Sequence, residues 1–156
     1  MDIRIREATR EDQDLIWKAT METVWNDLPP DERRHFDRAT LERHFRPHAK
    51  QVLESTDNSI LVAEGPDASI LGYAIVGSAS TMLSPVPFGF VYDVWVAPEA
   101  RRRGVARRLL AAAEDWCRAQ GYRKLKLEVA ASNVAARALY TADGFAEERI
   151  FMGRPL

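Results

Sequence analysis

The sequence predicts one mixed α/β domain over residues 1–156, and three observations lead to this prediction. Segments with strand-like alternation and segments with helical periodicity follow one another along the chain. The strongest strand signal, Phe90–Val96, is followed by an amphipathic helix and then by another strand, as in a right-handed crossover between parallel strands. No repeat or low-complexity segment divides the chain, whose length suits a single hydrophobic core.

The sequence pattern of the N-terminal third predicts a strand and two helical segments. Apolar and polar residues alternate at Ile3–Arg6, which is typical of a half-buried strand. Thr9–Asp12 reads as a helix start with acidic residues in the first turn, and Asn26–Pro30 ends that helix. A second helical segment covers Asp31–Leu53, and we expect an interruption near Pro47 because proline lacks the amide donor of a helix interior.

In the middle of the chain, the hydrophobic pattern changes from helical periodicity to the pattern typical of strands. Ile60–Ala63 and Ile70–Val76 predict two strands joined by a turn at Gly65–Asp67. Prolines make Ser84–Pro87 an expected loop. Phe90–Val96 follows as a strand rich in β-branched and aromatic residues.

The C-terminal third predicts two helices and two strands. An apolar face predicts a helix from about Gly104 to Gln120. Lys124–Val129 is then expected to be a strand, Asn133–Asp143 a short helix, and Phe145–Met152 a last strand.

Composition and charge exclude several classes of function. The chain has 22 lysines and arginines against 23 aspartates and glutamates, which argues against a protein that coats nucleic acid or an anionic membrane. No apolar run approaches the ~20 residues that span a bilayer, and the charged N-terminus is unlike a signal peptide. The single cysteine rules out an internal disulfide. We therefore expect a cytoplasmic protein without nucleic-acid or membrane partners.

A basic turn precedes the predicted helix at Gly104. Five of the eight residues in Arg101–Arg108 are arginine, although cations are disfavoured at a helix N-terminus. An anion bound to the free amides of the first turn reverses this penalty, and Gly104 and Ala106 allow its close approach. A solvated basic surface is the alternative interpretation. The turn lacks the Gly-Lys-Ser/Thr ending of a phosphate-binding Walker loop.

The spacing of Arg102, Gly104 and the small residue Ala106 resembles the pyrophosphate-binding signature of the GCN5-related N-acetyltransferase (GNAT) family. The resemblance continues upstream, where Asp93–Glu99 is similar to the family's fourth strand, whose free amides bind the pantetheine arm. Downstream, Leu127–Tyr140 resembles the second family motif, and its spacing is similar to that of the branch acetylating protein N-termini, including ribosomal-protein alanine. The residues that the resemblance assigns to coenzyme A are Val94, Trp95, Val96, Arg101, Arg102, Arg103, Gly104, Val105, Ala106, Arg107, Asn133 and Tyr140.

The resemblance implies both a fold and a reaction. The fold is a mixed, mostly antiparallel sheet of six to seven strands with about four helices, in which parallel fourth and fifth strands splay apart. The reaction is direct transfer of an acetyl group from acetyl-CoA, without a metal, to a primary amine of a small molecule or a peptide N-terminus. A non-catalytic sensor or scaffold that holds coenzyme A is the alternative. The sequence contains no motif that identifies the acceptor. A homodimer is compatible with the family.

Such a transfer needs a group that deprotonates the amine. Glu128 is the leading candidate, because on a strand it points away from the apolar Leu127 and Val129. A surface carboxylate paired with a neighbouring lysine is the alternative interpretation of Glu128. Asp93, on the predicted pantetheine-binding strand, competes for the same role, and either carboxylate can act through a water molecule.

Tyr140 is the candidate donor to the departing thiolate. Asn133 and Tyr140 are seven residues apart and therefore share one helix face, which in relatives looks toward the cofactor. The alternative is core packing, since Ala136, Leu139 and Tyr140 also form an apolar cluster at helical spacing.

Two further features of the sequence indicate neither a metal site nor a catalytic nucleophile. His44 and His48 have a spacing that can bind metal on a helix, but Pro47 lies between them and no third ligand is evident. Cys117 falls on the apolar helix face, which favours buried packing over nucleophilic catalysis.

Overall fold

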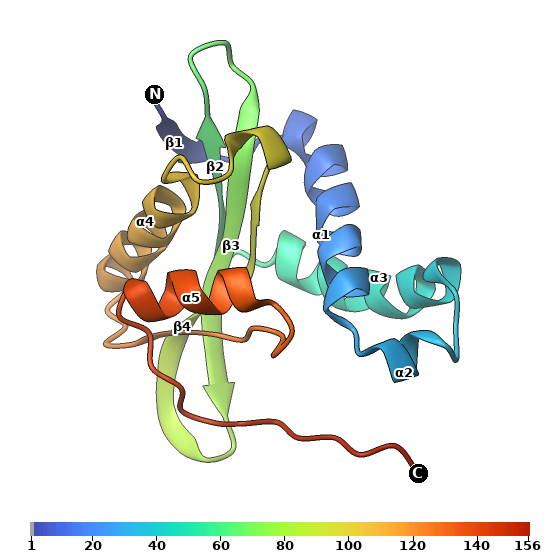
Figure 1. The fold of residues 1–156 in the computed structure, drawn as a ribbon. Helices are drawn as coiled ribbons and strands as arrows, with labels where there is room; N and C mark the ends of the chain where they lie inside the picture. Colours follow the sequence, from blue (N-terminus) through green and yellow to red (C-terminus); the bar gives the residue numbers. More distant parts are fainter. Residues whose placement is uncertain (1) are drawn as a thin grey trace.

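The computed structural model describes residues 2–156 and contains one five-stranded sheet in the order β1-β2-β3-β4-β5 (Figure 1). Neighbouring strands are antiparallel except β4 and β5, which are parallel as expected. The strands are β1 (Arg4–Glu7), β2 (Asn58–Glu64), β3 (Ile70–Thr81), β4 (Ser84–Val96) and β5 (Leu125–Leu127). The prediction of six to seven strands is therefore wrong for the described residues, which form five.

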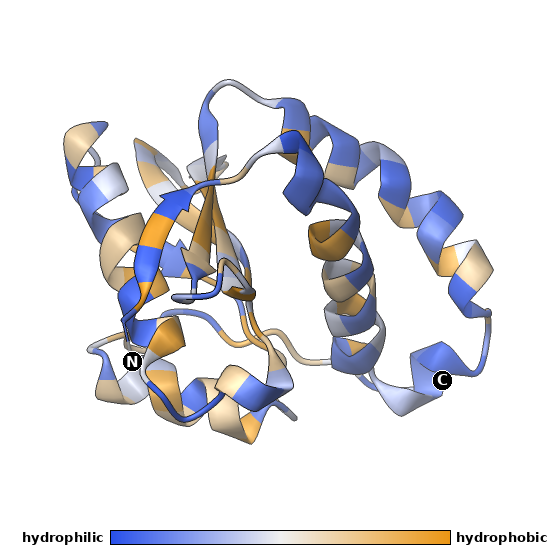
Figure 2. Cartoon of the chain, turned by 90° about the horizontal axis from the view of Figure 1, so that it is seen from above, coloured by the Kyte–Doolittle hydropathy of each residue, from blue (hydrophilic) through white to orange (hydrophobic). Residues whose placement is uncertain are grey.

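Helices cover both faces of this sheet. They are α1 (Gln13–Asp27), α2 (Pro30–Arg33), α3 (Arg38–Glu54), α4 (Val105–Ala119) and α5 (Val134–Ala142), with short 3-10 helices η1 (Arg10–Asp12) and η2 (Pro98–Ala100). In Figure 1 α4 lies on one side of the sheet and α1 and α3 on the other. The strands at the centre of Figure 2 are mostly hydrophobic, while α1 and α3 carry many hydrophilic residues. No helix of residues 2–156 is long and apolar enough to cross a membrane.

The predicted apolar face of α4 is confirmed. Val105, Leu109, Leu110, Ala113 and Cys117 are all buried, at the spacing expected of one helix face. They form the larger core cluster together with the sheet residues beneath them. A smaller cluster lies under α1 on the opposite face of the sheet.

The predicted helix start near Thr9 is also confirmed, and tertiary contacts reinforce it. Thr9 and Asp12 form a capping box, in which the Thr9 amide donates to Asp12 Oδ2 at 2.6 Å. Arg6 of β1 donates to the same Asp12 oxygen at 2.7 Å and to Glu64 Oε2 at 2.6 Å. The hydrogen bond from Arg6 is the main reason why the pKa of Asp12 falls to about 2.

The interruption expected at Pro47 is absent. Helix α3 runs unbroken through Pro47, and the break in the predicted segment lies instead between α2 and Asp37, whose side chain caps α3 by accepting from the Thr40 amide at 2.8 Å. A proline removes a single helical donor. Buried Leu41 and Ala49, on either side of Pro47, pack the helix against the domain, and this packing outweighs the lost bond.

The loop expected at Ser84–Pro87 is much shorter than predicted. Strand β4 already begins at Ser84, opposite Thr81, so the turn is formed by Met82 and Leu83. The register between β3 and β4 is irregular in this region, and β5 pairs with β4 only from Gly89 onward. Prolines fit here because few ladder hydrogen bonds need their missing N–H groups.

The C-terminal strands differ most from expectation. Strand β5 is confined to Leu125–Leu127, and the predicted strand at Phe145–Met152 is not formed. Figure 1 shows this last segment running away from the sheet toward the C-terminus. A strand forms only where the edge of another strand is available for pairing. The alternation of apolar and polar side chains within a segment does not show whether such an edge lies close to it.

Candidate active site

A β-bulge in β4 sets the direction of Asp93. Ile75 pairs with Asp93 and Val76 pairs with Val91, so Tyr92 is the extra residue. Without the bulge, Val91 and Asp93 would alternate onto the same face of the sheet. With it, Val91 joins the core under α4, while Asp93 lies opposite Ile75, which belongs to the cluster under α1.

Strands β4 and β5 separate at the same point. Their parallel pairing joins Gly89–Val91 to Leu125–Leu127 and then ends, although β4 continues to Val96. Along this second half, β4 has β3 on one side and an unpaired edge on the other. The Ala97 amide bonds to Leu71 of β3, so by alternation the backbone groups of Trp95 also face β3, while those of Val94 and Val96 face the free edge, where an extended ligand can pair with them.

Asp93 is held by two hydroxyl groups from different elements. Thr20 of α1 donates to Asp93 Oδ2 at 2.7 Å, and the Tyr73 hydroxyl of β3 donates to the same oxygen at 2.8 Å. Burial nevertheless raises the pKa of Asp93, more than these two donors lower it. Both hydroxyl donors meet Oδ2, and a backbone hydrogen bond from Val94 also lowers the pKa of the carboxyl group.

A second carboxylate, Asp27, lies close to this group. Asp27 is the last residue of α1, and burial raises its pKa, while a hydrogen bond with the Asn133 side chain lowers it. Asn133 also caps α5, with Oδ1 accepting from the Ala136 amide at 3.2 Å. The charge of Asp27 contributes to the raised pKa of Asp93. The end of α1 and the start of α5 thus meet beside the gap in the sheet.

Tyr140 completes the cluster from α5. Burial raises the pKa of its phenol to about 12, and the charges of Asp93 and Asp27 add to the rise. The ring packs edge-on against Phe145, with ring centroids 5.9 Å apart. Tyr140 therefore keeps its proton at neutral pH and can donate it.

Sequence reasoning did not find Asp27. Asp27 belongs to the segment Asn26–Pro30, whose pattern predicts only a helix stop, and α1 does end there. A carboxylate at a helix C-terminus is electrostatically unfavourable, because the carbonyl end of the helix dipole is negative. The unfavourable position of this charge is the sequence signal for a functional carboxylate, just as the unfavourable arginines at the start of α4 are the signal for an anion site.

Glu128 does not join this cluster. It lies just beyond β5 and is exposed. Its neighbours Lys124 and Lys126 both pair with Glu148, not with Glu128. Its catalytic role stays a prediction, and of the two carboxylates proposed from the sequence, the structure brings Asp93 to the gap and to Tyr140.

The arginine turn has the shape of an anion site. Arg102 and Gly104 have φ angles of 62° and 80°, in the left-handed region, and no side chain caps α4. Such a turn directs successive N–H groups to one side, where they bind anions. Space is open where a Cβ of Gly104 would stand. Arg101 ties the turn to the end of β4 by donating to the Val96 carbonyl at 3.2 Å.

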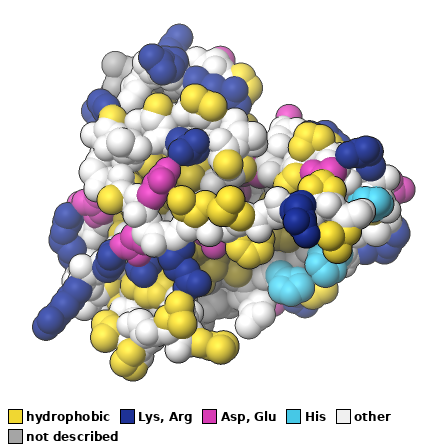
Figure 3. All heavy atoms as spheres, turned by 60° about the horizontal axis from the view of Figure 1, so that its bottom comes forward, with side chains coloured by type: hydrophobic (Ala, Val, Ile, Leu, Met, Phe, Trp, Pro, Cys, Tyr) yellow, Lys and Arg dark blue, Asp and Glu magenta, His cyan; other side chains and the backbone are white. Residues whose placement is uncertain are grey.

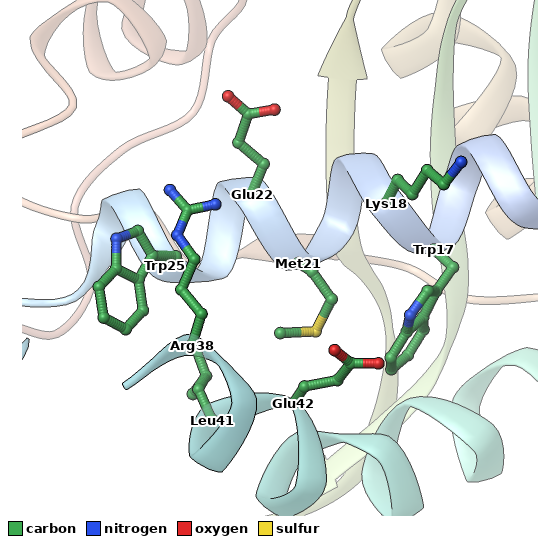
Figure 4. A pocket seen from close by; sticks show the side chains of 8 residues that line it. All are labelled: Trp17, Lys18, Met21, Glu22, Trp25, Arg38, Leu41 and Glu42. Atoms are coloured by element: carbon green, nitrogen blue, oxygen red, sulfur yellow. The ribbon is translucent and has the colours of Figure 1, made fainter. Parts of the chain in front are cut away.

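Two hollows border α1. A hollow of about 410 Å³ lies between α1 and β4 and is lined by Leu15, Lys18, Ala19, Glu22 and Trp95. A cavity of about 240 Å³ lies between α1 and α3 and is shown in Figure 4, with Trp17 and Trp25 at its two ends and Glu22 on the helix above. Glu22 and Lys18 line both. The larger hollow adjoins the unpaired edge of β4 through Trp95.

The remaining candidates do not contribute chemistry at this site. Within residues 2–156, no group of three or more His, Cys, Asp or Glu side chains has a metal-binding arrangement. Cys117 is buried against Gly89, and burial raises the pKa of its thiol to about 11, which suppresses the nucleophilic thiolate.

Comparison with known proteins defines the class. The model of the acetyltransferase (GNAT) family matches residues 15–145, and the chain belongs to this family. It is an acyl-CoA-dependent N-acetyltransferase with acetyl-CoA as co-substrate.

Individual relatives are similar to the chain over most of its length. An aminoglycoside N(6')-acetyltransferase type 1 of Stenotrophomonas maltophilia is 33% identical over 72% of this chain and 80% of the relative. Another, from Salmonella typhimurium, is 29% identical over 99% of this chain and 98% of the relative. The structure of AAC(6')-Iy with a bisubstrate analogue, CoA-S-monomethyl-acetylneamine, has the same fold, with a TM-score of 0.71, 21% identity and coverage of 100% of this chain and 99% of that one. These comparisons do not show the expected similarity to the branch that acetylates protein N-termini.

Proposed function

We propose that this enzyme acetylates a primary amine of a small molecule carrying more than one positive charge, such as an amino sugar. The observation that carries the proposal is the pair of carboxylates Asp93 and Asp27, both with a raised pKa. Among the ion pairs of residues 2–156, none joins a lysine or arginine to either carboxylate. Two carboxylates without a protein cation suit a ligand that brings its own cations.

The coenzyme fits the other side of the gap. The open, uncapped turn at Arg101–Arg107 suits a pyrophosphate, and the unpaired edge at Val94–Val96 suits the amides of a pantetheine arm. Asn133 and Tyr140 of α5 are proposed to face the point between them. When bound, acetyl-CoA supplies an acetyl thioester whose carbonyl carbon is open to attack by an amine.

Asp93 is proposed to accept a proton from the acceptor. The amine arrives as an ammonium ion, and the loss of one proton to Asp93, directly or through one water, leaves a lone pair for the new C–N bond. A raised pKa makes Asp93 a stronger base than an ordinary surface carboxylate. Its donors Thr20 and Tyr73 hold the carboxylate in place through this transfer.

Tyr140 is proposed to protonate the sulfur as the C–S bond breaks. Its pKa of about 12 lies above that of a free thiol, so full transfer before bond breaking is unfavourable. The phenol therefore donates a hydrogen bond first and gives up its proton as charge develops on sulfur. The second proton lost by the nitrogen restores the phenol. The protons balance, because one is released through Asp93 and the thiol leaves protonated.

The acceptor class follows from charge and from the relatives. Asp93 and Asp27 place two negative groups beside the gap, which favours a polycation over the single charge of a peptide N-terminus, while the larger hollow is lined by Glu22 together with Lys18. The relatives of Stenotrophomonas maltophilia and Salmonella typhimurium are described as aminoglycoside acetyltransferases. Exposed Glu128, on which the similarity to the peptide branch depends, adds no support for a peptide.

The test is acceptor-dependent release of coenzyme A thiol. Purified protein is supplied with acetyl-CoA and aminoglycosides, linear polyamines or peptides with a free N-terminus. We expect aminoglycosides to have the highest kcat/KM. Preference for a peptide would overturn the acceptor class but not the enzyme class. Saturable acetyl-CoA binding without thiol release for any amine would instead support the sensor or scaffold alternative.

A matched pair of variants distinguishes the effect of a charge at the site from the effect of the net charge of the protein. Asp27→Asn removes a site carboxylate, and Asp115→Asn removes one from the exposed face of α4, where the side chain is 79% exposed. Both change the net charge equally. The proposal expects weaker use of polycations in the first variant and unchanged kinetics in the second.

A further inference from the structure

Three side chains from three different elements meet at one point beside the gap in the sheet. Thr20 Oγ1 of α1 lies 2.8 Å from the Tyr73 hydroxyl of β3. These two oxygen atoms lie 2.7 and 2.8 Å, respectively, from Asp93 Oδ2 of β4. The three atoms form a closed triangle, the hydroxyl ring, in which every pair is at hydrogen-bond distance.

The hydroxyl ring is closed on its inner side and open at Asp93. Thr20 is 8% exposed and Tyr73 is fully buried, whereas Asp93 is only partly buried. The aromatic ring of Tyr73 is stacked on Trp95, which lines the larger hollow beside α1, with ring centroids 5.8 Å apart. Asp93 is therefore the member of the hydroxyl ring that a ligand can reach, and the two hydroxyl groups act through it.

The number of protons in the hydroxyl ring depends on the charge of Asp93. Each hydroxyl group carries one proton, and an ionised carboxylate carries none. The ionised form therefore has two protons for three contacts, and the contact between Thr20 and Tyr73 lacks a proton when both donate to Asp93. A proton on Asp93 Oδ2 supplies the third. Rotation of the hydroxyl groups then gives every contact one hydrogen bond.

The surroundings offer no equal alternative for the Tyr73 hydroxyl. The Ile16 carbonyl lies 3.4 Å from it, which is longer than the usual O–H···O distance of about 2.5–3.0 Å. Burial raises the pKa of Tyr73, so the phenol keeps its proton and takes part in the ring as a neutral group. The proton count of the ring is thus decided by Asp93 alone.

We propose that Thr20 and Tyr73 are positioning residues that let Asp93 change its protonation state by rotation of two hydroxyl groups, without movement of heavier atoms. The inference rests on the proposed role of Asp93 as the proton acceptor. In the transfer, one N–H bond of the ammonium group breaks, its electron pair stays on nitrogen, and the proton binds Asp93 Oδ2. Asp93 then donates to one hydroxyl group, that group donates to the other, and the second donates back to the carboxyl oxygen. A site that needs no reorganisation of its atoms is prepared for the transfer in advance.

The charges that act on Asp93 are separate from the two hydroxyl groups. The charge of Asp27, at the end of α1, raises the pKa of Asp93. Tyr140 of α5 is a neutral phenol, whose pKa the Asp93 charge helps to raise to about 12. On the surface, Figure 3 shows basic and acidic side chains side by side on the face it brings forward. Thr20→Val and Tyr73→Phe alter none of these charges.

A double-variant cycle tests the hydroxyl ring. Thr20→Val and Tyr73→Phe are made singly and together, because each removes a hydroxyl group and keeps nearly the same shape. The pKa of Asp93 is measured from the infrared C=O band of its carboxylic acid, which is identified by its absence in Asp93→Asn. This titration needs neither substrate nor activity.

The ring predicts that the double variant raises the pKa of Asp93 by more than the two single variants together. Each single variant removes one hydrogen bond from the ionised form and two from the protonated form, whereas the double variant removes two and three. The two single variants together therefore count the bond between Thr20 and Tyr73 twice, and the double variant counts it once. Shifts that simply add would show two independent donors and overturn the proposal.

Two controls distinguish the ring from a general change in α1. Thr20→Ser keeps the hydroxyl group and should titrate like the wild type. Thr23→Val removes a hydroxyl group that donates to the Ala19 carbonyl at 3.1 Å, and it should leave the band unchanged. An equal shift in Thr23→Val would assign the effect to the helix and overturn the proposal. Circular dichroism checks folding, and Thr20→Ala replaces Thr20→Val if valine disturbs α1.

Kinetics distinguish failure of this proposal from failure of the proposed function. If Asp93 is the base, the acidic limb of the kcat/KM profile should move with the infrared titration in each variant, while acetyl-CoA affinity stays the same. A limb that stays in place while the band shows the excess shift would support the ring and overturn the base role of Asp93. A limb that follows additive shifts would keep that role and overturn the ring.

Discussion

Two groups of carboxylates in this molecule have opposite electrostatic environments. At the start of the first helix, Asp12 accepts from Arg6 and from the Thr9 amide, and its pKa falls to about 2. At the gap between β4 and β5, Asp93 and Asp27 are partly buried without a protein cation, and the pKa of each rises. The N-terminal group is electrostatically complete, whereas the group at the gap lacks a positive charge.

This difference separates structural from functional acid residues. A carboxylate with arginine and amide donors stabilises the fold in its charged form and has little tendency to take a proton. A buried carboxylate without a cation holds a proton more readily and attracts a cationic ligand. The N-terminal group should therefore affect stability when altered, and the group at the gap should affect catalysis.

The largest expected effect is that of Asp93→Asn. Loss of the proton acceptor should lower kcat/KM by at least about a hundredfold, the usual range for a general base. Thiol release with a saturating acceptor measures it, with Asp115→Asn as the control. Folding stability should not fall, because the substitution removes a buried charge. A change of less than threefold in kcat/KM would assign the base role elsewhere, with Glu128 next to be tested.

Asp12→Asn should produce the opposite pattern, a loss of stability without a loss of acetyl-CoA binding. The fall in the pKa of Asp12 from 3.8 to about 2 corresponds to about 2 kcal/mol at neutral pH. Because the folded-state pKa is the lower one, this stabilisation is complete above pH 3.8 and is lost as the pH falls through about 2. Denaturant unfolding of both proteins at pH 7 and near pH 2 measures it. A difference that is as large near pH 2 as at pH 7 would show that charge is not its source.

Tyr140→Phe should lower kcat by at least about tenfold and leave acetyl-CoA affinity unchanged, because only the proton donor is lost. With a pKa of about 12, Tyr140 should also cause no fall in the wild-type rate between pH 7 and 10. Steady-state kinetics and calorimetric titration measure the two parts. An unchanged kcat would leave Tyr140 with a packing role against Phe145.

Asp27→Asn should have the smallest effect and the most selective one. We expect the KM of a polycationic acceptor to rise about fivefold, consistent with one solvent-screened charge contact, and that of a simple monoamine to change little. The Asp27 charge raises the pKa of Asp93, so its removal should move the acidic limb of the rate profile to lower pH. Equal effects on both acceptors, or an unmoved limb, would contradict a direct electrostatic role.

Much of the site is predictable from sequence because its parts are local. The arginine turn, Val94–Val96 and the pair Asn133 and Tyr140 each lie within one short segment, where spacing alone decides which side chains share a face. The capping box at Thr9 and the buried face of α4 are local for the same reason. Family membership follows from these segments in order, and the family model that matches residues 15–145 confirms it.

Other features were decided by contacts between distant parts of the chain. Thr20 and Asp93, 73 residues apart, meet through one hydrogen bond, and the bulge at Tyr92 turns Asp93 toward that contact. The same kind of packing brings Asp27 to Asn133. No periodicity in the sequence marks either pairing.

The sequence by itself determined that the domain is mixed α/β, where the buried face of α4 lies and to which family the chain belongs, because these depend on neighbours within a few residues. Only the tertiary structure decided that the charge of Asp93 acts on Tyr140, that Pro47 does not break α3, and that residues 145–152 form no strand on their own sheet. Burial, strand pairing and the pKa of a carboxylate depend on what the fold places beside a residue, and that information is absent from its sequence neighbours.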